Sequence, residues 1–258
     1  MGMARVSRSP LVLAYHGVAK VRVRDDPSLL FVAPNELLRH IRRLQRWGYE
    51  LLPFSVFAAC LAAGDAAGCA ALTFDDGFVD NLQTLAPLLA AEGVPATVFV
   101  PTGWLGQTHP YAPQTRVMTA EELLALHGRG VEIGAHTHSH PDLTTLDSEA
   151  AVAELRRGKR ELEGLLGKPV ETLAYPFGRA DAGTREAARA AGFAAACRTS
   201  GEGNWSDPFD IPRQDMTNAS TMLGLRLKRD NRYEPLVRHL PFRGARAVRR
   251  RLLRAAGR

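Results

Sequence analysis

Short apolar runs alternate with longer amphipathic stretches along most of the chain. An apolar run bounded by polar or glycine residues predicts a buried strand, and apolar residues spaced three and four apart predict a helix that covers a sheet. The predicted strands are 11–15, 49–52, 70–74, 96–100, 131–135, 173–175 and 193–197. The predicted helices are 34–47, 55–63, 80–92, 119–130, 148–166 and 182–191.

This alternation of strand and helix is typical of parallel strands joined by crossover helices. About seven strands favour a distorted (β/α) barrel over an open doubly wound sheet, and a chain of 258 residues suits one such α/β domain. No repeat or linker divides the chain. We therefore expect one barrel over residues 1–240, followed by a basic tail, helical or frayed, over residues 241–258.

The composition is that of an ordinary globular protein, with 45% hydrophobic and 23% charged residues. Cys60, Cys69 and Cys197 are odd in number and lack CxxC spacing, which indicates reduced thiols and neither a disulfide framework nor a zinc finger. The first apolar run ends at His16 and is too short for a signal peptide, and no run approaches the length of a membrane span. The sequence thus predicts a cytoplasmic location.

The net charge of +6 is concentrated at the C-terminus, because seven arginines and no acidic residue follow Phe242. The rest of the chain is close to neutral, which disfavours nucleic-acid binding, since such proteins carry positive charge along the binding groove. Val248, Leu252 and Ala255 form an apolar stripe at helical spacing, so peripheral contact with anionic lipid is one interpretation of the tail. A solvated, frayed terminus is the other.

Two adjacent carboxylates, Asp75 and Asp76, follow the apolar run that ends at Phe74. Two like charges held this close raise the pKa of one group or require a cation. Asp-Asp-Gly is also ordinary turn chemistry after a strand, because Asp hydrogen-bonds to nearby backbone and Gly accepts a positive φ. The pair alone leaves both interpretations open.

Further polar groups follow other predicted strands: His16, the segment 136–140 (HTHSH) and the segment 176–178 (PFG). Functional groups gather at the C-terminal ends of strands in a parallel barrel. His136 and His140 are four residues apart, so a compact turn directs both rings to one point, whereas His138 points away. Two histidines and one carboxylate leave coordination positions open, as catalytic sites require. A solvated surface turn explains the histidines alone, but together with the adjacent carboxylates they predict a metal site.

Three segments carry a family resemblance: 73–77 (TFDDG), 136–140 (HTHSH) and 175–178 (YPFG). They resemble the first three motifs of the polysaccharide deacetylases, the NodB-homology group or carbohydrate esterase family four, and the likeness extends over about residues 11–213. The resemblance implies a distorted (β/α) barrel and a divalent metal, usually zinc, with Co, Ni, Mn or Fe as alternatives. It also implies hydrolysis of an N-acetyl group from an amino sugar.

By position, Asp75 resembles the catalytic base of this family, and Asp76, His136 and His140 resemble its metal ligands. The residue types suit amide hydrolysis in their own right. A bound metal lowers the pKa of its water and polarises a carbonyl oxygen, and an adjacent carboxylate can take the proton. The backbone N–H of Phe177 occupies the position of the family's oxyanion contact.

The chain departs from the family pattern in two places. The third motif usually carries an arginine that orients the catalytic aspartate, but Ala174 stands there, as in a branch that reads Ala-Tyr-Pro-Phe-Gly. We expect Arg213 to supply the missing charge. The family's acid histidine is not clear near the C-terminus, where His239 lies among basic residues. His16 follows a predicted strand, as in relatives with a permuted barrel, so we expect His16 to be the general acid, with a structural histidine as the alternative.

The substrate-binding residues are expected in the third motif and in two long loops. The predicted set is Tyr175, Pro176, Phe177, Trp104 and Trp205. For Trp104 and Trp205, the two loop residues of this set, structural packing on the barrel is an equal alternative to substrate binding. The expected enzyme is a hydrolase of carbon–nitrogen bonds in linear amides, acting on an N-acetylated sugar in a glycan, a glycolipid or a glycosylated precursor, with lipid-linked sugars among the candidates.

Three rival functions stay open at this point. The same barrel could cleave a non-sugar or cyclic amide. Non-haem iron oxygenases use the same two-histidine, one-carboxylate ligand set. A sugar-binding relative without activity is the third, because the motif arginine is missing.

Overall fold

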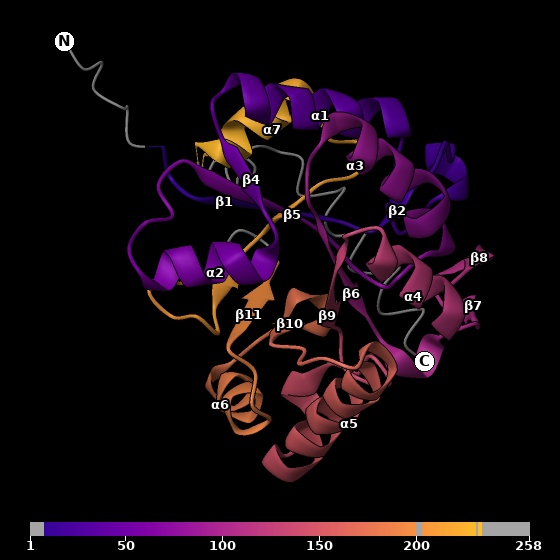
Figure 1. The fold of residues 1–258 in the computed structure, drawn as a ribbon, viewed down its shortest axis with the longest axis vertical. Coiled ribbons are helices and arrows are strands. Elements are labelled where there is room, and N and C mark those ends of the chain that lie inside the picture. Colours follow the sequence, from indigo (N-terminus) through magenta and orange to yellow (C-terminus); the bar gives the residue numbers. More distant parts are fainter. Residues whose placement is uncertain (1–7, 200–202, 231, 234–258) are drawn as a thin grey trace.

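A parallel sheet of nine strands forms the centre of the molecule (Figure 1). The structure, a computed structural model, describes residues 8–199, 203–230 and 232–233. The main path of the sheet follows the order β12-β11-β10-β9-β6-β5-β1-β13, and β4 pairs with β5 beside this path. The strands are β1 (Leu11–Tyr15), β4 (Glu50–Leu52), β5 (Cys69–Phe74), β6 (Thr97–Val100), β9 (Glu132–Ala135), β10 (Thr172–Ala174), β11 (Ala195–Arg198), β12 (Ile211–Pro212) and β13 (Gln214–Asp215).

One short segment brings the two ends of this sheet together. β12 pairs with β11 at one end of the path, and β13 pairs with β1 at the other end. Arg213 is the residue between β12 and β13, so both ends of the sheet meet at this position. The sheet is therefore nearly closed into a barrel, which confirms the predicted fold class. Counted as one interrupted strand, β12–β13 completes a barrel of seven strands, and β4 lies outside the count.

Helices lie between consecutive strands, as the alternation predicts. They are α1 (Pro34–Arg46), α2 (Phe54–Ala62), α3 (Ala86–Glu92), α4 (Ala120–Gly128), α5 (Ser148–Leu166), α6 (Ala182–Ala190) and α7 (Met222–Arg229). The first turns of the predicted helix 80–92 form a π-helix, η2 (Asn81–Leu85), that continues into α3. The predicted loop 101–117 contains the single-turn helix η3 (Thr102–Trp104) and the hairpin strands β7 (Thr108–His109) and β8 (Ala112–Arg116). The other short elements are β2 (Gly17–Val18), β3 (Phe31–Val32), η1 (Val23–Asp25), η4 (Leu143–Thr145) and η5 (Pro176–Gly178).

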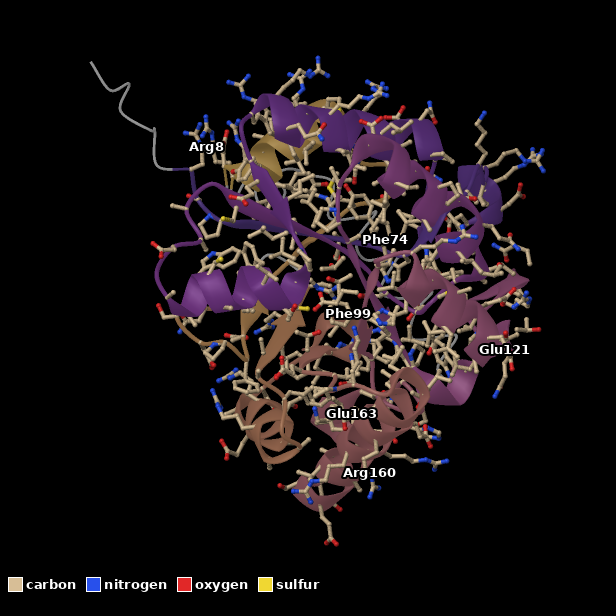
Figure 2. All side chains as sticks on the ribbon, in the orientation of Figure 1. Arg8, Phe74, Phe99, Glu121, Arg160 and Glu163 are labelled. Carbon is tan, nitrogen blue, oxygen red and sulfur yellow. The ribbon has the colours of Figure 1, made fainter. Side chains whose placement is uncertain are left out.

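Alternate residues of the strands supply two cores. The larger core includes apolar faces of the outer helices, for example Leu37 and Ile41 of α1, together with Phe74 of β5. The smaller core includes Phe99 and the aromatic residue Phe54 of α2, whose rings meet at a centroid distance of 5.6 Å. Figure 2 shows Phe74 and Phe99 in the interior and charged side chains at the periphery. Because the Phe54 N–H donates to Thr97 at the start of β6, α2 covers the N-terminal end of the barrel.

Polar side chains gather at the opposite, C-terminal end of the barrel strands. His16 follows β1, Asp75 follows β5 and His136 follows β9. The described helices include none long and apolar enough to cross a membrane. The expected domain boundary near residue 240, the basic tail over 241–258 and His239 lie outside the described residues.

Candidate active site

Asp75 is held at the end of β5 by a buried arginine. Its backbone N–H donates to the carbonyl oxygen of Tyr15, which continues the pairing of β5 with β1. Nη1 and Nη2 of Arg213 donate to Oδ1 and Oδ2 of Asp75, each at 2.7 Å. Nη1 also donates to Thr73 Oγ1 at 3.0 Å. The structure thus places Arg213 on the carboxylate that the missing motif arginine would contact.

The arginine decides the charge of this carboxylate. Burial by itself raises the pKa of Asp75, but the positive charge of Arg213, with smaller contributions from His136 and His16, lowers that pKa below its ordinary value. The Arg213 side chain is fully buried, and its guanidinium lies 5.6 Å from the centre of the Phe99 ring. A bidentate pair of this kind fixes the orientation of the carboxylate as well as its charge.

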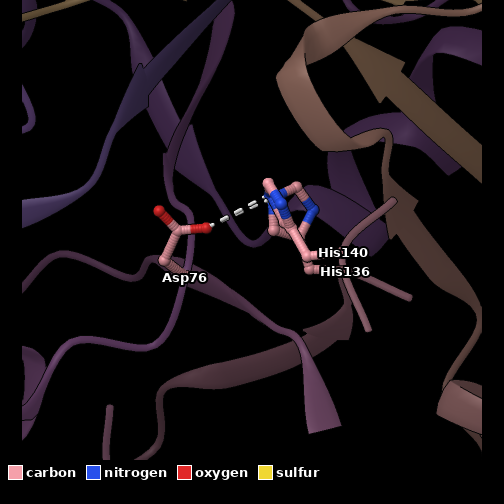
Figure 3. A group of neighbouring side chains, drawn as sticks. All are labelled: Asp76, His136 and His140. Atoms are coloured by element: carbon pink, nitrogen blue, oxygen red, sulfur yellow. Dashed lines mark ion pairs between the residues drawn. The ribbon is translucent and has the colours of Figure 1, made fainter. Parts of the chain in front are cut away.

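Asp76, His136 and His140 converge beside this pair (Figure 3). Oδ1 of Asp76 lies 3.5 Å from Nε2 of His136 and 3.6 Å from Nε2 of His140. All three residues are buried, and one candidate ligand atom from each lies within 4.8 Å of the others. The predicted two-histidine, one-carboxylate set is therefore brought together from β5 and β9, which are separated in the sheet by β6.

The hydrogen bonds around this cluster leave lone pairs pointing at one another. Nδ1 of His136 lies 2.7 Å from the carbonyl oxygen of Ala174, and because a carbonyl only accepts, Nδ1 carries the hydrogen and Nε2 carries the lone pair. Asp76 Oδ1 is buried without a hydrogen-bond partner among the described residues. Burial and the neighbouring His136 lower the pKa of His140 to about 3. Buried acceptors that face one another without donors fit a bound cation.

The backbone around the cluster adopts conformations that residues other than glycine rarely take. Asp76, Thr137, His140 and Phe177 have φ values of 70°, 69°, 59° and 58°. Such conformations cost about 1–3 kcal/mol each and gather at functional sites. In this chain these four residues all lie in the three motif segments.

Helix α5 packs against residues 136–140, the histidine segment, from outside the barrel. A Cβ added to Gly158 would lie 2.6 Å from the backbone carbonyl of Thr137, so the helix and the segment touch at this glycine. Glu154 accepts hydrogen bonds from the backbone N–H groups of His138 and Ser139. Nδ1 of His138 lies 2.8 Å from Glu161, so His138 points away from its two neighbours as expected.

His16 lies next to Asp75 at the mouth of the barrel. Tyr15 pairs with Phe74 in the sheet, so the residues that follow them, His16 and Asp75, are neighbours. Asn81 of η2 donates from Nδ2 to the carbonyl oxygen of His16 at 3.1 Å. The His16 side chain is partly exposed, which leaves it accessible to a ligand in the site.

The motif segments lie within a stretch that a known family describes. The polysaccharide deacetylase family model matches residues 63–196, more than half of the chain. This chain belongs to the polysaccharide deacetylase family. The matched stretch includes Asp75, Asp76, His136 and His140, and it extends through the third motif, 175–178.

Known members of the family match this deacetylase-family chain over part of their length. YxkH of Bacillus subtilis (strain 168) is 26% identical over 184 residues, which are 70% of this chain and 61% of YxkH. A chitin deacetylase of Pestalotiopsis sp is 35% identical over 107 residues, 42% of this chain and 33% of that enzyme. The chain thus spans less than two thirds of these relatives. The Streptococcus pyogenes deacetylase PplD shares the fold, with a TM-score of 0.73 at 20% identity, over 86% of this chain and 99% of PplD.

The expected substrate-binding residues divide into two groups in the structure. Phe177 is 41% exposed, and its ring centre lies 4.7 Å from that of His140. The ring centre of Trp104 lies 4.6 Å from that of His140. Both side chains therefore lie at the site, and Tyr111 joins them with a ring-centre distance of 6.2 Å to Phe177.

Three of the expected contacts do not lie at the site's surface. Tyr175 is fully buried and its hydroxyl donates to the carbonyl oxygen of Phe209, and the Pro176 side chain is buried too. Trp205 packs on Phe57 of α2, at the N-terminal end of the barrel. The placement of Trp205 at the rim was wrong because the loop before β12 returns to that opposite end before the strand begins.

One residue of the site has no counterpart in the sequence-based prediction. His109 of β7 is fully buried, and its Nε2 lies 3.1 Å from Asp76 Oδ2. It lies in a polar, Pro/Gly-rich segment without periodicity, so no pattern singled it out. The length of that segment was its sole signal, since long loops in compact domains are often functional.

Proposed function

We propose that this protein is a metal-dependent hydrolase that removes an N-acetyl group from an amino sugar. The observation that carries the proposal is the buried Oδ1 of Asp76, which has no hydrogen-bond partner in the described structure and faces two histidine nitrogens beside the ion pair of Asp75 and Arg213. Membership of the polysaccharide deacetylase family supports the same reaction. Asp76, His136 and His140 would hold a divalent cation, with zinc the first choice for nitrogen and carboxylate ligands.

The residues of the chain supply the proton transfers. A bound cation would polarise the acetyl carbonyl and lower the pKa of a water molecule. Asp75, kept ionised by Arg213, is placed to take a proton from the attacking water. The backbone N–H of Phe177 donates to the oxygen that gains negative charge. His16 then gives a proton to the departing amine, as a positioned histidine does in general acid catalysis.

The rim supplies surfaces for a sugar ring. Trp104, Tyr111 and Phe177 present aromatic rings around His140. Rings of this kind stack on the apolar faces of sugars while the polar groups of the site orient the acetamide. A lipid-linked sugar and a glycan remain equal candidates, and the cytoplasmic location remains a prediction from the sequence.

The substrate class is tested by acetate release. Purified protein is incubated with a panel of free, polymeric and lipid-linked N-acetylated sugars, with and without a chelator. Acetate released from at least one sugar, lost with the chelator and restored by Zn²⁺ is the expected result. Acetate release that the chelator does not change would contradict metal dependence, and turnover of simple amides alone would favour the non-sugar amidase.

The role of His16 is tested separately. In His16→Ala, zinc content measured by mass spectrometry is expected to equal that of the wild type, while deacetylation falls by at least about 10²-fold. Unchanged turnover would assign His16 a structural role. Iron in place of zinc, with a requirement for a co-substrate, would favour the oxygenase alternative.

The contacts of Arg213 argue against the third alternative, a sugar-binding relative without activity. A sugar-binding relative without activity was open because Ala174 replaces the motif arginine. The two hydrogen bonds from Arg213 to Asp75 support a competent base in spite of this replacement.

A further inference from the structure

His109 connects the candidate metal centre to the hairpin formed by β7 and β8. Its side chain is fully buried, and its ring stacks on Phe78 with centres 4.2 Å apart. Its Nε2 lies 3.1 Å from Asp76 Oδ2, and its Nδ1 lies 3.2 Å from the backbone nitrogen of Tyr111. Both ring nitrogens are therefore engaged, one by the carboxylate and one by the hairpin itself.

The backbone contact assigns the hydrogen on this ring. A backbone N–H can only donate, so Nδ1 of His109 accepts from Tyr111 and carries the lone pair. The ring hydrogen is then on Nε2, which donates to Asp76 Oδ2. The two oxygens of Asp76 are thereby distinguished, because Oδ2 has a donor while Oδ1 is buried with none among the described residues and faces His136 and His140.

We propose that His109 is a positioning residue that reserves Oδ1 of Asp76 for the metal. The proposal rests on the metal site of the proposed function. A carboxylate without an outer partner can rotate or present both oxygens, and either change alters the ligand set. Hydrogen bonds that orient a ligand in this way contribute about 10- to 100-fold to metal affinity.

The hairpin is fixed to the turn that contains Asp76. Phe78 and Val117 form an isolated antiparallel bridge, and the N–H of Met118 donates to the carbonyl oxygen of Gly77 at 2.9 Å. The segment that delivers His109 is thus bonded to the residues directly after Asp76. These backbone contacts, together with the Tyr111 N–H bond to the ring and the stacking on Phe78, fix the position of His109 at this end of the barrel.

The test measures zinc affinity, and activity is not its readout. Protein stripped of metal is titrated with Zn²⁺ against a chromophoric chelator, for the wild type, His109→Phe and His109→Gln. Phe keeps an aromatic ring against Phe78 but has no donor, so His109→Phe is expected to bind zinc about 10- to 100-fold more weakly. The amide nitrogen of Gln can replace the Nε2 donor, so His109→Gln is expected to stay within about threefold of the wild type.

His127→Phe is the matched control. His127 bonds through Nδ1 to the carbonyl oxygen of Val131, at the end of α4 away from the site, so its loss should leave zinc affinity unchanged. Equal zinc affinity in wild type and His109→Phe would overturn the proposal, as would a His109→Gln variant as weak as His109→Phe. A wild-type protein that binds no zinc would instead overturn the proposed function itself.

Discussion

At the scale of single residues, the ion pair with Arg213 keeps Asp75 ionised, as the proposed role of a base requires. Burial and the arginine act in opposite directions on the pKa of Asp75, and the arginine prevails. The positive charge of Arg213 also explains how two adjacent carboxylates can both be buried. Arg213 neutralises Asp75, while Asp76 faces three histidines.

Removing this charge should shift the pH dependence of turnover. In Arg213→Ala, burial is opposed by no more than the smaller contributions of His136 and His16, so the pKa of Asp75 rises and the acid limb of the kcat/KM profile moves to higher pH. We expect turnover near neutral pH to fall by about 10²-fold or more. Leaving a buried charge without its partner should lower the free energy of unfolding by about 3–5 kcal/mol. Rates of acetate release between pH 4 and 9 check the first effect, and denaturant unfolding checks the second.

Arg198→Ala is the control for this change. Arg198 pairs at 3.4 Å with Asp210 and is partly exposed, so its loss should leave the pH profile where it is. An Arg213→Ala variant with unchanged turnover and an unchanged acid limb would show that Asp75 does not depend on the arginine.

Asp80 should make the stability of the protein fall as the pH rises. Burial raises the pKa of Asp80 to about 6, although its Oδ1 accepts from the N–H of Val18 at 2.8 Å. The folded protein therefore binds a proton more tightly than the unfolded chain, and stability is lost as the pH rises from about 4 to about 6. Asn keeps the acceptor without the charge. Asp80→Asn should thus be more stable than the wild type at pH 7.5, by at most about 3 kcal/mol.

The measurement is unfolding of both proteins at several pH values. The gain from Asp80→Asn should disappear below about pH 4, where the wild-type carboxyl is already protonated in both states. A difference between the two proteins that does not vary with pH would mean that Asp80 stays ionised on folding without cost.

The sequence could indicate the residues of the site that lie in contiguous motifs and directly follow predicted strands. Asp75, Asp76, His136 and His140 are of this kind, and the structure brings all four together. His109 could not be found in this way, because it is a lone histidine in a segment without periodicity. Its place in the site depends on tertiary contacts with Asp76 and Tyr111, which the local sequence does not encode. Whether an aromatic residue such as Trp205 lies at one end of a barrel or the other depends on the path of the loop, and local pattern does not encode that path.

At the scale of elements, the contact between α5 and the histidine segment depends on one glycine. Gly158→Ala should gain helix propensity, but the added Cβ would meet the Thr137 carbonyl at 2.6 Å, and backbone cannot move aside as a side chain can. The segment that carries His136 and His140 should shift. We expect a loss of stability of about 1–3 kcal/mol, as for other overpacked sites, and weaker zinc binding.

Gly164 provides a control on the same helix. No atom in the described part of the chain lies within 4 Å of a Cβ added there, so Gly164→Ala should stabilise the protein by about 0.5–1 kcal/mol through helix propensity. Thermal unfolding and zinc titration of the two variants make the comparison. If both alanines stabilise the protein equally, α5 does not press on the histidine segment.

Element positions followed from the sequence where the deciding interactions are local. The capping box of Thr119 and Glu122 begins α4, and Asp147 accepts from the Ala150 N–H at the start of α5, so both helices begin close to the predicted positions 119 and 148. The π-helix Asn81–Leu85 was not predictable, because apolar spacing does not distinguish it from an α-helix. Its first residue, Asn81, bonds to His16, which agrees with the tendency of such turns to occur at functional sites.

At the scale of the whole molecule, the site is assembled across long sequence separations. Asp75 and its arginine are 138 positions apart, and Arg213 lies between two strands of two residues each. Strands this short give no periodic signal, so the closure of the barrel could not be located from pattern alone. Six of the seven barrel strands were predicted, because they are apolar runs with a helix between most neighbours, whereas the seventh predicted strand, 49–52, is β4, which lies beside the main path of the sheet.

The proposed metal should therefore stabilise the entire barrel. Its ligands come from segments after β5 and β9, and an ion that binds the folded state but not the unfolded chain adds stability in proportion to its occupancy. At a free Zn²⁺ concentration of 100 times the dissociation constant the gain is about 2.7 kcal/mol. For a chain of this size that corresponds to a rise in Tm of about 5 to 10 °C over chelator-treated protein.

Calorimetry with chelator and with graded Zn²⁺ measures this rise, and His140→Ala serves as the control because it removes one ligand. The variant should melt at the same temperature with and without zinc. A wild-type Tm that is independent of zinc would mean that the three side chains do not act as a metal site in the folded protein. A rise of equal size in His140→Ala would mean that zinc binds elsewhere on the chain.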